Sequence, residues 1–282
     1  MALYGTISSG VVRRAGDTVD LLDLPHPDLG AALAAGLTAT ELAVTPARET
    51  LPLTDVQLLA PVPRPGSVWL GGLSYRSHVL DMQDEMPAYP PIGGCSPSAI
   101  TGPTDPIVLP AIAPDNVDYE GEVAVVIGRT GKHIVPSEGW HYVFGVTACQ
   151  DVSARDVQAG RFMPSNRPDD AKGKSFDSFL PVGPWVATPE EFADRDDIGM
   201  RVYVDDELRQ DARTSDLLYP IPEFVAFLSK FVTLRPGNLV LTGTPGGVGY
   251  PTKRFLRPGN RVRTEVEVIG TLDNPVIAET VK

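Results

Sequence analysis

Three carboxylates precede one apolar segment of this 282-residue chain. The stretch DYEGEVAVVIG, residues 118–128, carries Asp118, Glu120 and Glu122 before a run of aliphatic residues. Successive side chains of a strand point to opposite faces, so Glu120 and Glu122 would share one face with Cβ atoms roughly 7 Å apart. Two negative charges that close repel each other unless water or a cation lies between them. The pattern therefore fits either a solvated strand end or a metal site.

A further carboxylate, Asp151, ends a second apolar segment, GVTACQD. Three carboxylates that converge on one point suit a hard divalent cation such as Mg²⁺ or Mn²⁺, with water in the remaining positions. Such a site would keep about one net negative charge, so a nearby Lys or Arg is expected, with Arg155 and Lys174 as candidates. Lys174 taken alone is more typical of a solvated surface residue.

Other chemistries find little support in the sequence. The four histidines form no H-x-x-x-H pair, and no G-x-S-x-G motif occurs. The segment LTGTPGGVG lacks the Gly-Lys-Ser/Thr ending of a phosphate-binding loop, although Thr242 and Thr244 could present hydroxyl groups to a ligand. The net charge of −12 argues against binding to nucleic acid or to an anionic membrane.

The composition is that of a globular cytoplasmic protein. Hydrophobic residues make up 42% of the chain, no apolar run is long enough to span a membrane, and no secretory signal is visible. Cys95 and Cys149 lie far apart in the sequence and predict neither a disulfide framework nor a zinc site. We expect both thiols to be reduced.

Short strands separated by turn residues must position these side chains. Residues 1–62 predict a small N-terminal domain with strands at ALYGTI, GVVRRAGDTVDLLDL and DVQLLAPV. Residues 63–282 predict a β-rich body with a single convincing helix at 221–232, where apolar residues follow an i, i+3, i+4, i+7 spacing. Residues 87–103 contain too much Pro and Gly to predict regular structure, and they are expected to belong to a mobile lid spanning about 75–102. The fold class is α+β, predominantly β, with a mixed β-sandwich roll.

Five long motifs together resemble the fumarylacetoacetate hydrolase family. They occur in that family's order over about residues 67–280, and they are DYEGEVAVVIG, DVSARDVQ, KGKSFDSFLPVGPW, the run from LRQDARTSD to TGTPGGVG, and GTLDNPV. The first 62 residues are similar to the small variable N-terminal domain of many members. The resemblance implies a β-roll fold, a homodimer, and Mg²⁺ or Mn²⁺ bound by Glu120, Glu122 and Asp151.

The resemblance also implies roles for other residues. Arg155, Gln158 and Thr244 match positions that line the family's substrate site, with Tyr75 in the lid motif, and Lys174 matches a lysine that stabilises negative charge near the metal. In members, a lid His and a Glu pair to activate water. Here the lid reads SYRSHVLDM, so His78 keeps the histidine and Asp81 takes the acid position, although Asp84 or Glu85 could substitute. Cys95 stands about where many members carry a lid lysine.

The expected function is hydrolysis of the C–C bond in a 2,4-dioxo acid, an acylpyruvate-like substrate, to give pyruvate and a carboxylic acid. His78, oriented by Asp81, would activate water for attack on C4, and Lys174 with Gln158 or Thr244 would hold the developing oxyanion. The same enolate chemistry supports an alternative, a metal-dependent 2-oxo acid decarboxylase or a tautomerase/isomerase acting on oxaloacetate-like or 2-hydroxy-dienoate substrates. A non-catalytic, metal-stabilised binding module is the third reading.

Overall fold

Two β-sheets dominate the structure, a computed structural model that describes residues 2–162 and 167–281. The larger sheet runs in spatial order through β4 (Ala47–Pro52), β3 (Thr18–Leu22), β2 (Gly10–Ala15), β1 (Leu3–Ile7), β13 (Leu180–Ala187), β11 (Val143–Gln150), β10 (Gly121–Ile127), β16 (Leu239–Leu241), β5 (Val68–Gly71) and β6 (Ile92–Cys95). A further strand, β7 (Ile100–Thr101), follows β6 along the chain and pairs with β13, so the part of the sheet from β13 to β6 curls back on itself. The predicted α+β, predominantly β fold is confirmed.

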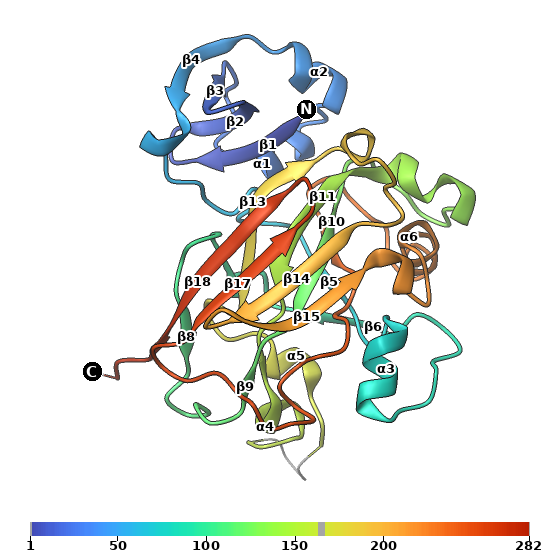
Figure 1. The fold of residues 1–282 in the computed structure, drawn as a ribbon. Coiled ribbons are helices and arrows are strands. Elements are labelled where there is room, and N and C mark those ends of the chain that lie inside the picture. Colours follow the sequence, from blue (N-terminus) through green and yellow to red (C-terminus); the bar gives the residue numbers. More distant parts are fainter. Residues whose placement is uncertain (1, 163–166, 282) are drawn as a thin grey trace.

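The smaller sheet covers one side of this roll. Its spatial order is β15 (Glu207–Arg213), β14 (Gly199–Val204), β17 (Arg261–Val266), β18 (Gly270–Ala278) and β8 (Ile107–Leu109), and it crosses the front of the molecule in Figure 1. A separate short pair joins β9 (Val117–Asp118) to β12 (Ser153–Ala154). The helices are α1 (Leu29–Ala34), α2 (Ala39–Val44), α3 (Arg76–Met82), α4 (Arg155–Gln158), α5 (Asp170–Gly173) and α6 (Ile221–Leu228).

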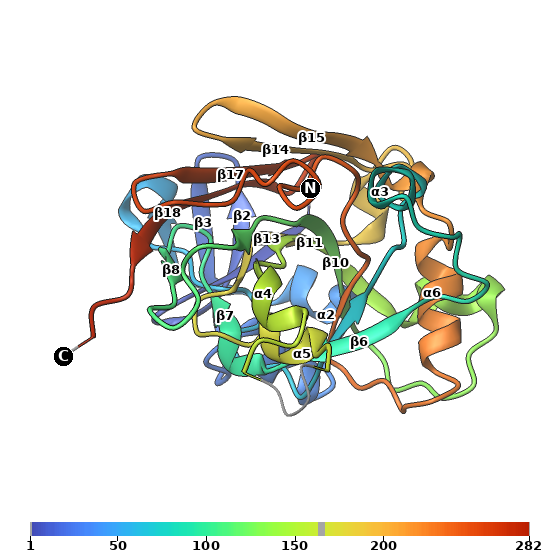
Figure 2. The same cartoon turned by 90° about the horizontal axis from the view of Figure 1, so that it is seen from below.

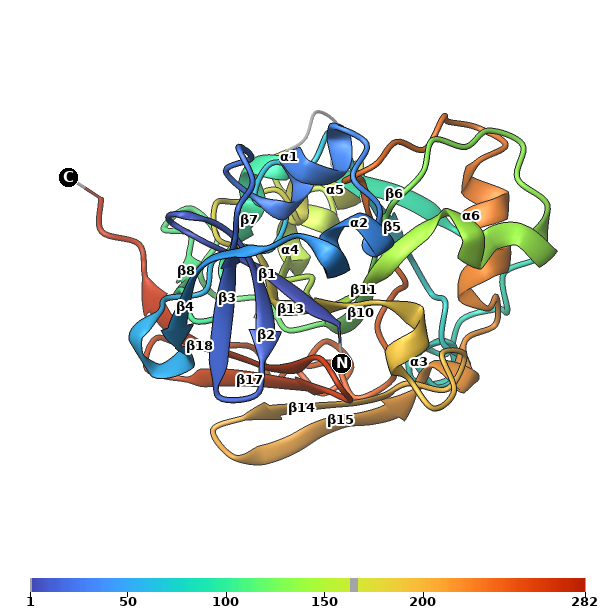
Figure 3. The same ribbon diagram turned by 90° about the horizontal axis from the view of Figure 1, so that it is seen from above.

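The N-terminal strands lie at one end of the molecule and α4 and α5 at the other, as Figures 1 and 2 show. Strand β1 pairs with β13, with Leu3 opposite Ala187, so the N-terminal strands extend the larger sheet. Figure 3, which views the molecule from above, shows β1, β2 and β3 side by side. The domain boundary at residue 62 stays a prediction. None of the helices in the described ranges is long and apolar enough to cross a bilayer.

After Gly121 and Glu122, strand β10 is an unbroken apolar run over residues 123–127, and its packing explains why. All seven of its residues are buried. Ala124 and Val126 enter one hydrophobic cluster, inside the roll, whereas Val123, Val125 and Ile127 enter a second cluster on the opposite face. A strand that is buried on both faces needs apolar residues at every position rather than at alternate ones.

Two local predictions from the sequence are wrong. Residues 87–103 do hold regular structure, namely β6 and β7, because their prolines lie outside both strands, where no ladder N–H is required. The segment DVQLLAPV forms no strand and contributes only an isolated bridge between Leu59 and Thr6. Helix α6 forms where the apolar spacing predicts a helix, with Pro222 in its first turn.

Candidate metal centre

The three predicted metal ligands converge at one end of β10 and β11. In this antiparallel pair Glu122 lies opposite Cys149, and the Asp151 N–H donates to the Glu120 carbonyl, so the register places Asp151 beside Glu120. Glu120, Glu122 and Asp151 are 4%, 1% and 1% exposed. Each offers a carboxylate oxygen, and these oxygens all lie within 4.8 Å of one another.

Two cations partly neutralise these carboxylates. Lys174 Nζ lies 2.6 Å from Glu120 Oε2 and also contacts Asp151 Oδ2. Arg155 Nη2 lies 2.6 Å from Glu120 Oε1 and 2.7 Å from Oδ2 of Asp118, a fourth buried carboxylate. Four ionised carboxylates and two cations leave two negative charges, which is the charge that one divalent cation would balance.

The pKa values of the three carboxyl groups differ according to their neighbours. Burial alone would raise the pKa of Glu120, but Arg155 and Lys174 lower it to about 2. Burial raises the pKa of Asp151 to about 6. Burial and the charge of Asp151 also raise the pKa of Glu122. Ionising all three groups together is therefore unfavourable unless further positive charge is present.

The residues fit a hard divalent cation. Asp151 Oδ1 is buried and has no hydrogen-bond partner among the described residues, so it is available as a ligand atom. Glu122 Oε2 accepts a hydrogen bond from Gly243 N at 2.7 Å, which orients this carboxylate and leaves its second oxygen available. An all-oxygen donor set of this kind suits Mg²⁺ or Mn²⁺ and does not distinguish between them.

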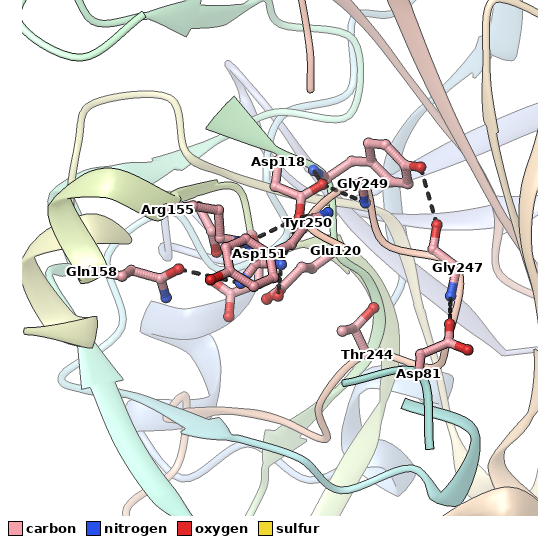
Figure 4. A network of polar contacts seen from close by, with 12 residues as sticks. Asp81, Asp118, Glu120, Asp151, Arg155, Gln158, Thr244, Gly247, Gly249 and Tyr250 are labelled. Atoms are coloured by element: carbon pink, nitrogen blue, oxygen red, sulfur yellow. Dashed lines mark hydrogen bonds and ion pairs between the residues drawn. The ribbon is translucent and has the colours of Figure 1, made fainter. Parts of the chain in front are cut away.

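Arg155 is largely engaged by protein groups. Its Nε and Nη2 donate to Asp118, Nη2 also donates to Glu120, and Nη1 donates to Gln158 Oε1 at 3.2 Å (Figure 4). A guanidinium group has five N–H bonds, so a single Nη1 hydrogen remains for a substrate. Only Oε1 of Gln158 takes part in the contact with Arg155. The two N–H hydrogens on Nε2 of Gln158 are not used in this contact.

Asp118 is a site residue that sequence reasoning left without a role. Its Oδ1 accepts from Gly249 N at 2.7 Å and its Oδ2 from Tyr250 N at 3.0 Å, in addition to both contacts with Arg155. The ring of Tyr250 lies over the guanidinium at 5.6 Å. Asp118 thus joins Arg155 to the loop that follows the TGTP motif. Its place two residues before Glu120 was visible in the sequence, but its partners were not.

His78 and Asp81 both lie on α3, as expected, yet no hydrogen bond joins them within the described part of the chain. His78 is 6% exposed, and its Nδ1 is buried without a partner. Asp81 is exposed and accepts a hydrogen bond from Gly247 N at 2.7 Å through Oδ2, and Figure 4 shows it turned toward this glycine. Burial lowers the pKa of His78, so its imidazole is neutral at pH 7.

Two other residues of the segment that was expected to form a lid have buried or half-buried positions. Tyr75 is 1% exposed and packs in the second hydrophobic cluster, and its hydroxyl group lies beside Thr242. Cys95 is half-buried on β6, and burial raises the pKa of its thiol to about 12. The position where the family resemblance implies a lysine therefore carries a neutral group.

Thr244 is positioned by a residue that the motifs did not single out. Its Oγ1 donates to Gly121 O at 3.0 Å and accepts from Gln210 Nε2 at 2.8 Å. Gln210 belongs to β15 in the smaller sheet, far from the metal ligands in sequence, so only the tertiary fold brings it here.

Known proteins resemble the chain over most of its length. Residues 67–277 match the family model described as fumarylacetoacetate (FAA) hydrolase C-terminal. A mitochondrial oxaloacetate tautomerase of Bos taurus is 40% identical over 229 residues, which cover 80% of this chain and 71% of that protein. Among solved structures, a 2-hydroxyhepta-2,4-diene-1,7-dioate isomerase from Mycobacterium marinum has a TM-score of 0.80 and 32% identity, covering 100% of both chains. A fumarylacetoacetate hydrolase from Exiguobacterium antarcticum has a TM-score of 0.84 and 30% identity, covering 99% of this chain and 100% of that one.

Proposed function

Because this chain belongs to the fumarylacetoacetate hydrolase family, we propose that it is a divalent-metal-dependent tautomerase or isomerase of a small 2-oxo acid such as oxaloacetate. The reaction moves a proton between C3 of the acid and the oxygen on C2. This was the alternative to C–C bond hydrolysis in our reading of the sequence, and the names of the tautomerase and isomerase relatives favour it.

The observation that carries the proposal is the separation of His78 from Asp81. The water activation that the resemblance implies pairs the lid histidine with a carboxylate that orients its ring toward water. Asp81 instead accepts from Gly247 N, and His78 is a buried, neutral imidazole without an acidic hydrogen-bond partner. Such a ring still offers a nitrogen lone pair, which suffices to remove a proton from carbon.

Different side chains would bind the metal, transfer the proton and stabilise negative charge. Glu120, Glu122 and Asp151 would hold Mg²⁺ or Mn²⁺, which when bound supplies Lewis acidity toward the oxygens of a 2-oxo acid. The imidazole of His78 would take the proton from C3 as the C–H bond breaks and C2=C3 forms, and it would return this proton to the C2 oxygen. Lys174 keeps its charge, because Asp151 and Glu120 raise its pKa against the opposing effect of burial, so it would stabilise negative charge on the acid.

The test compares two reactions of the purified protein. Loss of the enol form of oxaloacetate is followed by its ultraviolet absorbance, and release of pyruvate is measured with a panel of acylpyruvates, each with Mg²⁺, Mn²⁺ or a chelator. We expect metal-dependent tautomerisation and little pyruvate. Release of pyruvate from an acylpyruvate at a higher kcat/KM than tautomerisation would establish the hydrolase instead. Equal tautomerisation with metal and with chelator would refute the metal requirement.

A further inference from the structure

Gln210 connects the smaller sheet to the candidate site. It is 1% exposed, and its amide makes four hydrogen bonds there: Oε1 accepts from Gly121 N at 3.0 Å, and Nε2 donates to Thr244 Oγ1 at 2.8 Å, to Pro245 O at 2.9 Å and, at the longer distance of 3.5 Å, to Gly246 O. The chemistry of two partners fixes the orientation of this amide. A backbone N–H can only donate and a carbonyl can only accept, so Oε1 must face Gly121 and Nε2 must face Pro245.

This orientation determines the direction of the Thr244 hydroxyl. Since Nε2 is a donor, Oγ1 of Thr244 must accept from it. The other partner of Oγ1 is the carbonyl of Gly121, which can only accept, so the single hydroxyl hydrogen points there. A hydroxyl group has one hydrogen and two lone pairs. Thr244 therefore has no hydrogen left for a ligand and one lone pair that is still free.

We propose that Gln210 is a positioning residue that makes Thr244 a hydrogen-bond acceptor, and not a donor, toward the ligand. The identity of that ligand, a 2-oxo acid, rests on the proposed function. The substrate group next to Thr244 must then bring a hydrogen of its own, as an enol hydroxyl or a water molecule does. A keto or carboxylate oxygen at this position would meet a lone pair. Thr244 thus favours the enol form of the acid, through a residue 34 positions away in the sequence.

Gln150 provides a matched control. It is 0% exposed, its Oε1 accepts from Glu120 N at 3.0 Å, and its Nε2 donates to Thr264 Oγ1 at 2.6 Å. The two glutamines thus hold adjacent N–H groups of the E-x-E segment by the same kind of bond. Only Gln210 also contacts Thr244, so a comparison of the two separates support of the backbone from control of the hydroxyl.

The main experiment is a double-mutant cycle. Gln210→Met and Gln150→Met are each made in the wild type and in Thr244→Val, and kcat/KM for enol oxaloacetate is measured. We expect Gln210→Met to lower kcat/KM about 10- to 100-fold in the wild type, the usual effect of losing a group that orients a ligand-binding side chain. In Thr244→Val the same change should lower kcat/KM about twofold or less, since only the support of the backbone at Gly121 and Pro245 is then lost. Gln150→Met should lower kcat/KM by the same factor in the wild type and in Thr244→Val. Equal losses from Gln210→Met in both backgrounds would overturn the proposal.

A replacement variant and a binding measurement complete the test. If Gln210→Met does not fold, Gln210→Glu takes its place, because it has the same shape, keeps an acceptor for Gly121 N and loses the donor to Thr244. Binding of oxalate, a planar dianion that brings no hydrogen, is measured by calorimetry with Mn²⁺ and needs no turnover. Oxalate should bind more tightly to Gln210→Met, where the hydroxyl can turn and donate, and no more tightly to Gln150→Met. A tenfold weaker affinity in Thr244→Val would show that Thr244 donates and would refute the inference.

The two proposals fail in different ways. A wild type that binds oxalate with Mn²⁺ but does not convert enol oxaloacetate refutes the proposed function, and the oxalate data then decide the role of Gln210. A wild type that is an active tautomerase, with equal losses from Gln210→Met in both backgrounds, refutes only the role of Gln210.

Discussion

Substitution of Asp81 separates the two roles that this residue could have. In the structure its Oδ2 accepts a hydrogen bond from Gly247 N at 2.7 Å, and the side chain is exposed. Asp81→Asn keeps an oxygen for this bond and removes the charge. If Asp81 only holds α3 against the loop at Gly247, kcat/KM for tautomerisation should stay within about threefold, because substitutions at exposed positions usually change free energies by about 0.5 kcal/mol or less. Asp81→Ala, which loses the bond, should lower the free energy of unfolding by about 1 kcal/mol.

A catalytic partnership with His78 predicts a much larger effect. Loss of a general base costs about 10²- to 10⁴-fold in rate, and loss of the carboxylate that orients such a base has a comparable cost. The assay is kcat/KM for enol oxaloacetate with saturating Mn²⁺, with thermal unfolding measured in parallel. His78→Gln is the reference variant, and it should lose about 10²-fold or more. A loss of that size in Asp81→Asn, with unchanged thermal stability, would refute the assignment of Asp81 to a purely structural contact.

Three further predictions concern the charges around the site. Lys174→Met removes one cation from two buried carboxylates, so it should lower the free energy of unfolding by about 3–5 kcal/mol in chelator, and excess Mn²⁺ should restore part of this loss in urea denaturation. Since burial lowers the pKa of His78, kcat/KM should persist as pH falls through 6.5 and decline only at lower pH; a decline centred above 6.5 would contradict this. Asp118→Asn should lower kcat/KM about 10- to 100-fold, because Arg155 and the loop at Gly249 lose their shared carboxylate, whereas Asp211→Asn, at an exposed surface pair, should have no such effect in the same assay.

The convergence of the three candidate metal ligands could be predicted from the sequence for a physical reason. Glu120 and Glu122 lie two apart beside a strand, so they share a face, and Asp151 ends a neighbouring apolar segment. Antiparallel pairing of β10 with β11 then sets the three carboxylates together. Charge balance named Lys174 and Arg155 as candidate partners, and the structure brings both to the same carboxylates.

The contacts that depend on distant segments could not be predicted. Spacing places His78 and Asp81 on neighbouring turns of a helix, but it does not reveal that Gly247 N competes for the carboxylate. Gln210 lies in the motif run that begins with LRQDARTSD, but it reaches the site only because the smaller sheet packs over the end of β10, which residue spacing does not reveal. The strand β6 was missed because composition alone does not show that its prolines lie outside the paired residues.

Binding of Mn²⁺ is the most direct test of the central claim, that three buried carboxylates hold the ion on which the reaction depends. Free Mn²⁺ is measured by electron paramagnetic resonance during titration of the wild type, of Glu122→Gln, and of Glu265→Gln, a control carboxylate on β17. We predict a single tight ion per chain in the wild type and in Glu265→Gln, and an affinity at least about tenfold weaker in Glu122→Gln. Equal Mn²⁺ affinity in all three proteins would contradict the account.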